Sequence, residues 1–337
     1  MNSIFIDKLN GIKTSRPPVW FMRQAGRILP NYQKLKESYS FREMMDNKQL
    51  AAKVTLLPIT DLGVDAAILF SDILIIPECM GMKLEFTENG PKFHNAIMDI
   101  NNKFTPDLSK LNHVYNNIEE VKKISSTPLI GFCGGPLTTF LFMFRGNEND
   151  KSFKSALKFF YSNQKESLKI IEQITEISIE YVKKQIDSGI DCFQLFETYC
   201  GIIPSEMYKK LILPFSKKIL NASKEKNTPS IFFPKNFNDG LKYIDSSVCD
   251  FVSIDWNLSL DYARSIVDDE VGIQGNMDPR VFYSSRKEID KYLKTLINFG
   301  ENNQDWIFNL GHGFIPDIDY KKVIHVVDWI KETDWNR

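Results

Sequence analysis

The sequence predicts an α/β protein built as a single (β/α)8 (TIM) barrel, and three observations support this prediction. Eight short apolar segments of four or five residues are distributed along the 337-residue chain. Each is apolar on both faces and bounded by Gly, Pro, Asp or Asn, which is typical of strands buried on both sides of a parallel sheet. Amphipathic helical patterns separate most of them, and eight alternating strands are the number that closes a barrel.

The predicted strands cover nearly the whole chain, and no linker, repeat or low-complexity tract divides it, so we expect one domain over residues 1–337. The long excursion Pro77–Thr127 is expected to carry extra helices or loops over the mouth of the barrel. An open doubly wound sheet is the alternative, but it would normally bring a glycine-rich first turn, and no Gly-x-Gly-x-x-Gly is present. The eight predicted strands are Pro18–Met22, Ala66–Phe70, Pro128–Phe132, Cys192–Phe196, Ser230–Phe233, Phe251–Asp255, Gly272–Asn276 and Trp306–Leu310.

Six helical patterns accompany these strands. The first, Lys48–Leu62, contains Pro58, which predicts a kink. The longest, Asn163–Ser188, stops at Gly189, a residue typical of helix C-termini. The others are Ser205–Lys224, Leu258–Val267, Ser285–Phe299 and Asp319–Glu332.

Composition narrows the class of function. The 42 basic and 43 acidic side chains nearly cancel, which argues against general nucleic-acid or membrane binding. The N-terminus has no signal-peptide core, and the most apolar run, Ala66–Ile76, is too short to span a bilayer. Five scattered cysteines without a Cys-x-x-Cys pair predict free thiols in a reducing cytoplasm. The four histidines have no metal-binding spacing, so we expect no metal site.

The strongest candidate for a binding site lies near the N-terminus. Seven basic residues and no acidic one occur between Lys8 and Lys36. Arg23 and Arg27 lie at its centre, and guanidinium groups suit two-point binding of carboxylate or phosphate. Gly26 between them would let the backbone approach a ligand closely. The pattern predicts an anion site, with a solvated basic surface as the alternative.

Polar and glycine residues also follow the other predicted strands, where a barrel places its active site. Asp72 lies within an apolar run, where an unpaired carboxylate is costly, and this favours a functional role over a structural salt bridge. His312, between two glycines, is equally compatible with a functional and a structural role. We expect Glu197 and Asp255 to pair with Lys235 inside the barrel.

Six motifs in order along the chain resemble the uroporphyrinogen decarboxylase family. The ten-residue first motif, residues 18–27, is highly specific on its own. The resemblance implies a (β/α)-barrel homodimer that needs no metal or organic cofactor. It also implies removal of the four acetate carboxyl groups of uroporphyrinogen III to give coproporphyrinogen III, a step of haem and tetrapyrrole synthesis. The motifs are Pro18-Val-Trp-Phe-Met-Arg-Gln-Ala-Gly-Arg27, Phe70-Ser-Asp-Ile-Leu74, Gly131-Phe-Cys-Gly-Gly-Pro136, Gln194-Leu-Phe-Glu197, Gln274-Gly-Asn276 with Asp278-Pro279, and Asn309-Leu-Gly-His-Gly313.

The same resemblance implies roles for individual residues. Asp72 would lie at the centre of the macrocycle and accept hydrogen bonds from the pyrrole N–H groups, and His312 would contact the substrate from the far side. Asp72, with Arg23 or Arg27, would be catalytic. The residues that would bind substrate carboxylates are Arg23, Gln24, Ala25, Gly26 and Arg27.

Two site positions depart from the family pattern, and the glycine-rich stretch usual after the second is replaced by Arg145-Gly-Asn-Glu-Asn-Asp150. Thr198 stands where the family usually has serine and keeps a hydroxyl, so substrate contact is expected. Phe142 stands where the family usually has tyrosine, so the ring remains while the hydroxyl donor is lost. Two rival functions stay open: a methyltransferase of the same barrel superfamily, which would require a zinc site, and a non-catalytic tetrapyrrole-binding protein. An activity assay and a metal analysis separate them.

Overall fold

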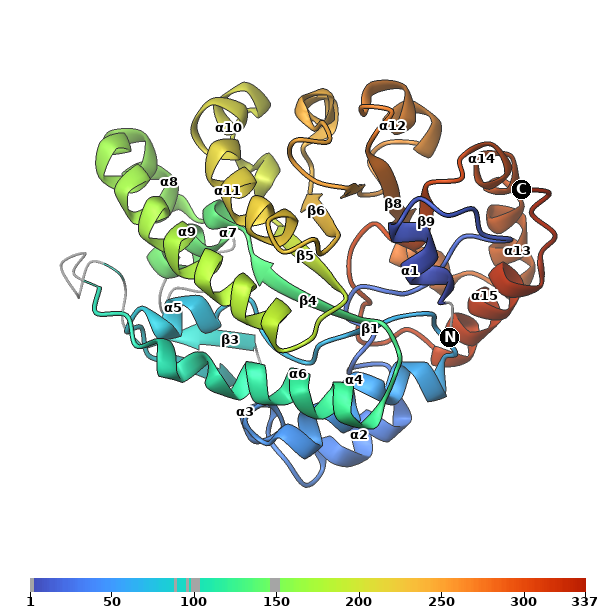
Figure 1. Cartoon of the computed structure of the whole chain (residues 1–337), viewed down its shortest axis with the longest axis horizontal. Coiled ribbons are helices and arrows are strands. Elements are labelled where there is room, and N and C mark those ends of the chain that lie inside the picture. The colour runs from blue at the N-terminus through green and yellow to red at the C-terminus, as the bar shows by residue number, and fades with distance from the viewer. Residues whose placement is uncertain (1–2, 88–89, 95–96, 98–103, 146–151) are drawn as a thin grey trace.

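A parallel sheet of seven strands forms the centre of the molecule in a computed structural model, which describes residues 3–87, 90–94, 97, 104–145 and 152–337 (Figure 1). The strand order is β1-β4-β5-β6-β7-β8-β9, and every neighbouring pair is parallel. The seven strands are β1 Ala67–Ile68, β4 Leu129–Gly134, β5 Cys192–Glu197, β6 Ser230–Pro234, β7 Phe251–Ser253, β8 Gly272–Met277 and β9 Trp306–Leu310. They correspond to the second to eighth predicted strands, which are therefore confirmed.

The first predicted strand, Pro18–Met22, is wrong. This segment makes only one isolated parallel bridge, between Val19 and Phe308 of β9. On its other side the Val19 carbonyl accepts a 2.8 Å hydrogen bond from the Asp65 amide, just before β1. The segment thus lies between the two edge strands, and the strands themselves form a curled sheet and not a closed ring of eight. Proline has no backbone N–H to donate, and the chain turns at Met22, so no ladder develops.

Helices cover the sheet, with α9 and α11 side by side against β4 and β5 (Figure 1). The single helix predicted over Ser205–Lys224 is two helices that meet at Ile212, because Pro214 cannot continue the hydrogen-bond pattern of the first. The pattern Ser285–Phe299 is also divided into two. The α-helices are α1 Ile4–Leu9, α2 Pro30–Lys36, α3 Phe41–Asp46, α4 Lys48–Asp61, α5 Ile75–Cys79, α6 Asn112–Ile124, α7 Pro136–Arg145, α8 Lys154–Ser162, α9 Gln164–Asp187, α10 Ser205–Leu211, α11 Leu213–Lys224, α12 Leu260–Ile266, α13 Arg286–Lys294, α14 Ile297–Asn302 and α15 Tyr320–Glu332.

The long excursion between β1 and β4 does carry additional structure, as predicted. Within its described part it contains the antiparallel pair β2 Leu84–Thr87 and β3 Gly90–Phe93, a short 3-10 helix at Leu108–Leu111, and α6. No helix in the described part of the chain is long and apolar enough to cross a membrane.

A buried polar network fixes the N-terminal segment to the interior of the sheet. The Trp20 indole N–H donates to the Gln274 side-chain oxygen at 2.9 Å. The Gln274 amide in turn donates to Gln194 on β5 at 3.2 Å and to Ser253 on β7 at 3.1 Å. Because buried polar groups are costly unless they are bonded, this network specifies one position for the segment that leads into Arg23.

Candidate active site

The loop at Met22–Arg27 is held by bonds to β9 and β1. The Met22 amide donates to the Asn309 side chain at 3.1 Å, and the Phe314 amide donates to the Met22 carbonyl at 3.2 Å. Arg23 then adopts a left-handed backbone conformation with φ 62°. Such a conformation is uncommon for a residue with a side chain, and it persists only where surrounding bonds enforce it.

Gln24 anchors this loop. Its side chain is fully buried, accepts a hydrogen bond from the Phe21 amide at 2.9 Å and donates to the Ala66 carbonyl at 2.7 Å. Both ends of the amide are thus bonded to backbone, and Gln24 acts on the site by fixing the loop. Ala25 is half-buried against the core, and Gly26 has φ 141°, a conformation that side chains rarely allow.

The two arginines of this loop form no ion pair with any carboxylate of the described chain. Part of the Arg23 side chain is exposed to solvent, but protein atoms surround most of it. This burial lowers the pKa of the guanidinium, and the charge of Arg27 lowers it further. That combination is expected for a side chain on the wall of a concave site that water can reach. Other basic residues of the N-terminal run have structural roles, since Arg16 pairs with Asp65 at 2.7 Å and Lys8 is buried.

Asp72 faces the same site. Burial raises the pKa of its carboxyl group to about 6, although the Leu74 amide, Arg23 and Arg27 all favour the ionised form. One carboxylate oxygen accepts the Leu74 N–H at 2.8 Å, at the start of α5. Asp72 is thus influenced by the charges of both arginines, while no ion pair joins them in the described chain, and a desolvated carboxylate of this kind is a candidate catalytic group.

His312 follows β9, whereas Asp72 follows β1. The Pro18–Met22 segment, which leads into Arg23, lies between these two strands. Burial, Arg23 and Lys235 lower the pKa of its imidazole to about 3, so the ring is neutral at working pH. The adjacent Gly313 leaves room for the Arg23 side chain, because an added Cβ would lie 2.3 Å from the Arg23 Cδ atom. Gly311 has a similar constraint, since its Cβ would lie 2.6 Å from the Trp256 amide nitrogen.

An aromatic wall, which we define as Phe142, Phe153 and Tyr199, completes the site. The Phe142 and Tyr199 ring centroids are 5.8 Å apart, and those of Phe153 and Tyr199 are 4.6 Å apart. The Arg145 guanidinium lies 4.4 Å above the Phe142 ring. Thr198, half-buried, precedes Tyr199 at the end of β5. The sequence placed Tyr199 three residues beyond the predicted strand Cys192–Phe196, where a barrel has its active site, but assigned it no role.

The expected pairing of Glu197 and Asp255 with Lys235 is wrong. The fully buried Glu197 carboxylate accepts hydrogen bonds from the Thr138 amide at 2.7 Å, the Leu137 amide at 3.2 Å and the Thr138 hydroxyl, which are donors at the start of α7. The amides at a helix N-terminus are a favourable partner for a carboxylate.

Asp255 accepts from two backbone amides, those of Asn236 at 2.6 Å and Asn257 at 2.9 Å. Lys235 instead lies 5.7 Å from the Trp256 ring and has no carboxylate partner in the described chain. Backbone amides therefore satisfy Asp255, and backbone amides together with the Thr138 and Tyr208 hydroxyls satisfy Glu197. The lysine contributes its positive charge to the surroundings of His312.

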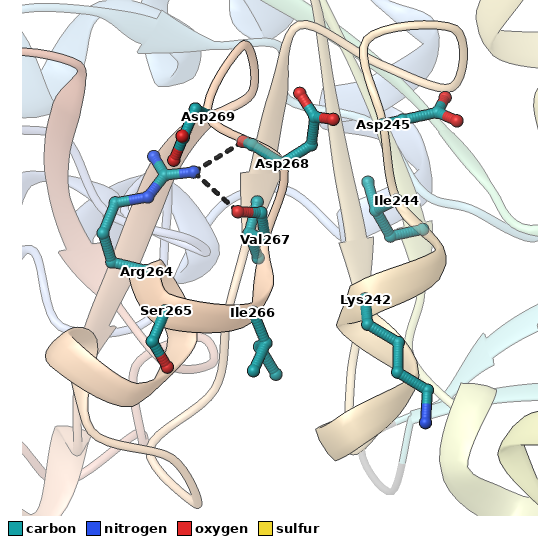
Figure 2. Close-up of a pocket in the computed structure, with 9 residues that line it drawn as sticks. All are labelled: Lys242, Ile244, Asp245, Arg264, Ser265, Ile266, Val267, Asp268 and Asp269. Carbon is teal, nitrogen blue, oxygen red and sulfur yellow. Dashed lines mark hydrogen bonds between the residues drawn. The ribbon is translucent and has the colours of Figure 1, made fainter.

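The hollow shown in Figure 2 lies elsewhere. It is lined by Lys242, Ile244, Asp245 and residues 264–269, which precede β7 and β8, so it lies at the opposite end of the sheet from the arginines. The Arg264 guanidinium there donates to the Val267 and Asp268 carbonyls at 3.1 and 2.6 Å. Because these groups are already bonded to one another, this hollow offers no comparable site.

The fold defines a class, α/β proteins with a curled parallel sheet, and the candidate site places two arginines and one acid at the carboxyl ends of its strands. The uroporphyrinogen decarboxylase family model matches residues 1–333. The chain belongs to the uroporphyrinogen decarboxylase family.

Relatives agree with this assignment, and a solved structure shares the fold. A uroporphyrinogen decarboxylase of Chlorobium phaeobacteroides is 37% identical over 343 residues, covering 98% of this chain and 97% of the relative. One of Francisella tularensis subsp. novicida is 35% identical, covering 98% and 99%. Among solved structures, a methyltransferase from Methanosarcina mazei superposes with a TM-score of 0.80 at 15% identity, covering 98% of this chain and 99% of that one. At that identity the likeness shows the fold alone.

Proposed function

We propose that this protein is a uroporphyrinogen decarboxylase that removes the four acetate carboxyl groups of uroporphyrinogen III to give coproporphyrinogen III, without a metal or organic cofactor. The observation that carries the proposal is the arrangement of Arg23 and Arg27, without an ion-pair partner in the described chain, around the desolvated Asp72. A flexible macrocycle ringed by carboxylates is a ligand that matches two arginines and one central acid.

The chemistry follows from where charge develops. Loss of carbon dioxide from an acetate on a pyrrole leaves an electron pair that needs an acceptor. Protonation of the pyrrole ring beforehand makes a cationic ring that can accept that pair. An ionised Asp72 at the ring centre stabilises this positive charge and accepts hydrogen bonds from the pyrrole N–H groups. Its partial desolvation strengthens the interaction.

Arg23 and Arg27 have a positioning role in this reaction. Each guanidinium donates to a substrate carboxylate and holds it relative to Asp72, which reduces the entropy cost of reaching the reactive geometry. After carbon dioxide has left, a proton relayed by one of the two arginines converts the remaining CH2 carbon into a methyl group, and the proton first added to the ring is released to restore the pyrrole. The neutral His312, Thr198, Phe142 and the backbone of residues 24–26 complete the contacts with the macrocycle.

We further propose the arrangement in which the protein works. Pro18–Met22 takes the place of the eighth strand between β9 and β1, although it forms only one bridge. The chain is then a (β/α)8 barrel of one domain. Two copies form a homodimer in the cytoplasm, without a nucleic-acid or membrane partner, and the five buried free cysteines suit a reducing compartment. Sedimentation at the protein concentration of the assay tests the dimer.

The decisive experiment is anaerobic incubation of the purified protein with uroporphyrinogen III, followed by chromatographic separation of the products. We expect intermediates of decreasing carboxyl number and then coproporphyrinogen III. Binding of the substrate without any loss of carboxyl groups would favour a non-catalytic tetrapyrrole-binding protein. Metal analysis of the same preparation tests the methyltransferase alternative, which would show bound zinc.

A further inference from the structure

Tyr199 is fixed in the aromatic wall by ring packing and by one hydrogen bond of its backbone. Its ring packs edge-on against Phe153 and Phe142, and its backbone amide donates to the Thr138 hydroxyl at 3.1 Å. That hydroxyl donates to the buried Glu197 carboxylate. The chain Glu197–Thr138–Tyr199 thus connects the end of β5 to the first turn of α7. The position of the Tyr199 ring is therefore set by buried groups and not by solvent.

The hydroxyl of Tyr199 has a different environment from its ring. The side chain is half-buried, and the hydroxyl has no hydrogen-bond partner in the described part of the chain. The other two members of the wall are phenylalanines, so this hydroxyl is the polar atom that the wall presents. Tyr199 follows β5, at the carboxyl end of the parallel sheet, where Asp72 follows β1 and Arg23 follows Pro18–Met22. Consistent with this placement, Tyr199 is among the groups that raise the pKa of the Arg23 guanidinium.

We propose that the Tyr199 hydroxyl donates a hydrogen bond to the substrate carboxylate that Arg23 holds, and so supplies the aromatic hydroxyl that Phe142 lacks. The inference rests on the proposed function, because it assigns a further substrate contact to the same site. A carboxylate has lone pairs for both donors, and neither the guanidinium nor the hydroxyl is bonded to a protein acceptor in the described chain. Tyrosine hydroxyls in largely buried surroundings usually have a partner, which here is the ligand.

The test is Tyr199→Phe, which removes only the hydroxyl. We expect kcat/KM with uroporphyrinogen III to fall by about tenfold or more, the usual size for a lost hydrogen bond to a charged group. The unfolding temperature should stay the same, because the ring and the bond from the Tyr199 amide are kept. The control is Tyr161→Phe, an exposed tyrosine of α8, which should leave both quantities unchanged.

A second variant separates a substrate contact from a packing effect. The double variant Tyr199→Phe/Phe142→Tyr returns one hydroxyl to the same wall, and we expect it to recover most of the lost kcat/KM. The inference is overturned if Tyr199→Phe has wild-type kinetics, or if its loss of activity comes with a lower unfolding temperature and is not recovered in the double variant.

Binding of uroporphyrinogen III, measured anaerobically on the wild type and Tyr199→Phe, distinguishes this inference from the proposed function. If the wild type binds without turnover and Tyr199→Phe binds at least about tenfold more weakly, the contact stands and the proposed decarboxylation fails. If the wild type turns over and Tyr199→Phe binds equally well, the proposed function stands and the contact fails. If the wild type does not bind, both are overturned.

Discussion

Asp72 and Arg23 influence each other's charge without forming an ion pair. Asp72 raises the pKa of the Arg23 guanidinium, and Arg23 lowers the pKa of the Asp72 carboxyl, yet burial has the larger effect on both. No ion pair joins them in the described chain. The left-handed backbone of Arg23 and the bond from the Leu74 amide to Asp72 fix where each side chain begins. Both charges therefore remain available to a ligand.

Asp72→Asn tests the charge-stabilising role. We expect turnover of uroporphyrinogen III to fall at least about 100-fold, because the amide can still accept a hydrogen bond but no longer stabilises a cation. The unfolding temperature should be unchanged or higher, since a desolvated charge is removed. Asp261→Asn, on exposed α12, is the matched control and should be fully active. Near-normal turnover in Asp72→Asn would remove this carboxylate from the mechanism.

The pH dependence follows from the raised pKa of Asp72, about 6. Protonation below that value removes the charge, so kcat/KM should be constant near pH 7 and decline by about tenfold per pH unit on the acid side. The measurement is a pH profile of kcat/KM under anaerobic conditions. The residual activity of Asp72→Asn should lack this decline. If Asp72→Asn shows the same decline of kcat/KM at low pH, another group must be the one that titrates.

His312 should take no part in that titration. Since its pKa is lowered to about 3 by burial, Arg23 and Lys235, the ring is neutral across the working range. We expect its NMR ring resonances to stay constant between about pH 5 and pH 8, in contrast to an ordinary histidine. His312→Gln should weaken substrate binding but leave the decline of kcat/KM at low pH unchanged. If the low-pH decline of kcat/KM moves to another pH in His312→Gln, the prediction that the His312 ring is neutral is wrong.

Gly313→Ala tests whether the position of the Arg23 side chain matters. The added methyl group would lie 2.3 Å from the Arg23 Cδ atom, so the arginine has to move, whereas the backbone of Gly313 is not in a conformation reserved for glycine. We expect KM to rise about tenfold with little change in the unfolding temperature, because displacement of a binding group costs affinity and geometry. Wild-type kinetics would show that Arg23 works equally well from a displaced position.

The sequence predicted the interior of the fold well, because seven strands buried on both faces are recognisable as short apolar runs. It failed at Pro18–Met22, whose apolar character is the same but whose prolines and following turn allow one bridge only. The break between α10 and α11 was also missed, although Pro214 marks it.

The site was predicted in part, for a physical reason. Arg23, Arg27 and Asp72 stand out because local charge or local apolarity makes them unusual in the chain itself. The partners of Glu197 depend on where the first turn of α7 lies, and the role of Tyr199 depends on rings distant in sequence. Such relationships arise only when the strands are assembled side by side.

The loosely bridged segment between β9 and β1 has one more consequence. Side-chain acceptors take the place of the missing ladder there: the Val19 amide donates to Asp65 at 2.7 Å, the Trp20 indole to Gln274 at 2.9 Å and the Met22 amide to Asn309 at 3.1 Å. The backbone that carries the arginines is therefore held by individual side chains and not by strand pairing. A single substitution among those three acceptors would be expected to displace the arginines while the pairing of every strand is kept.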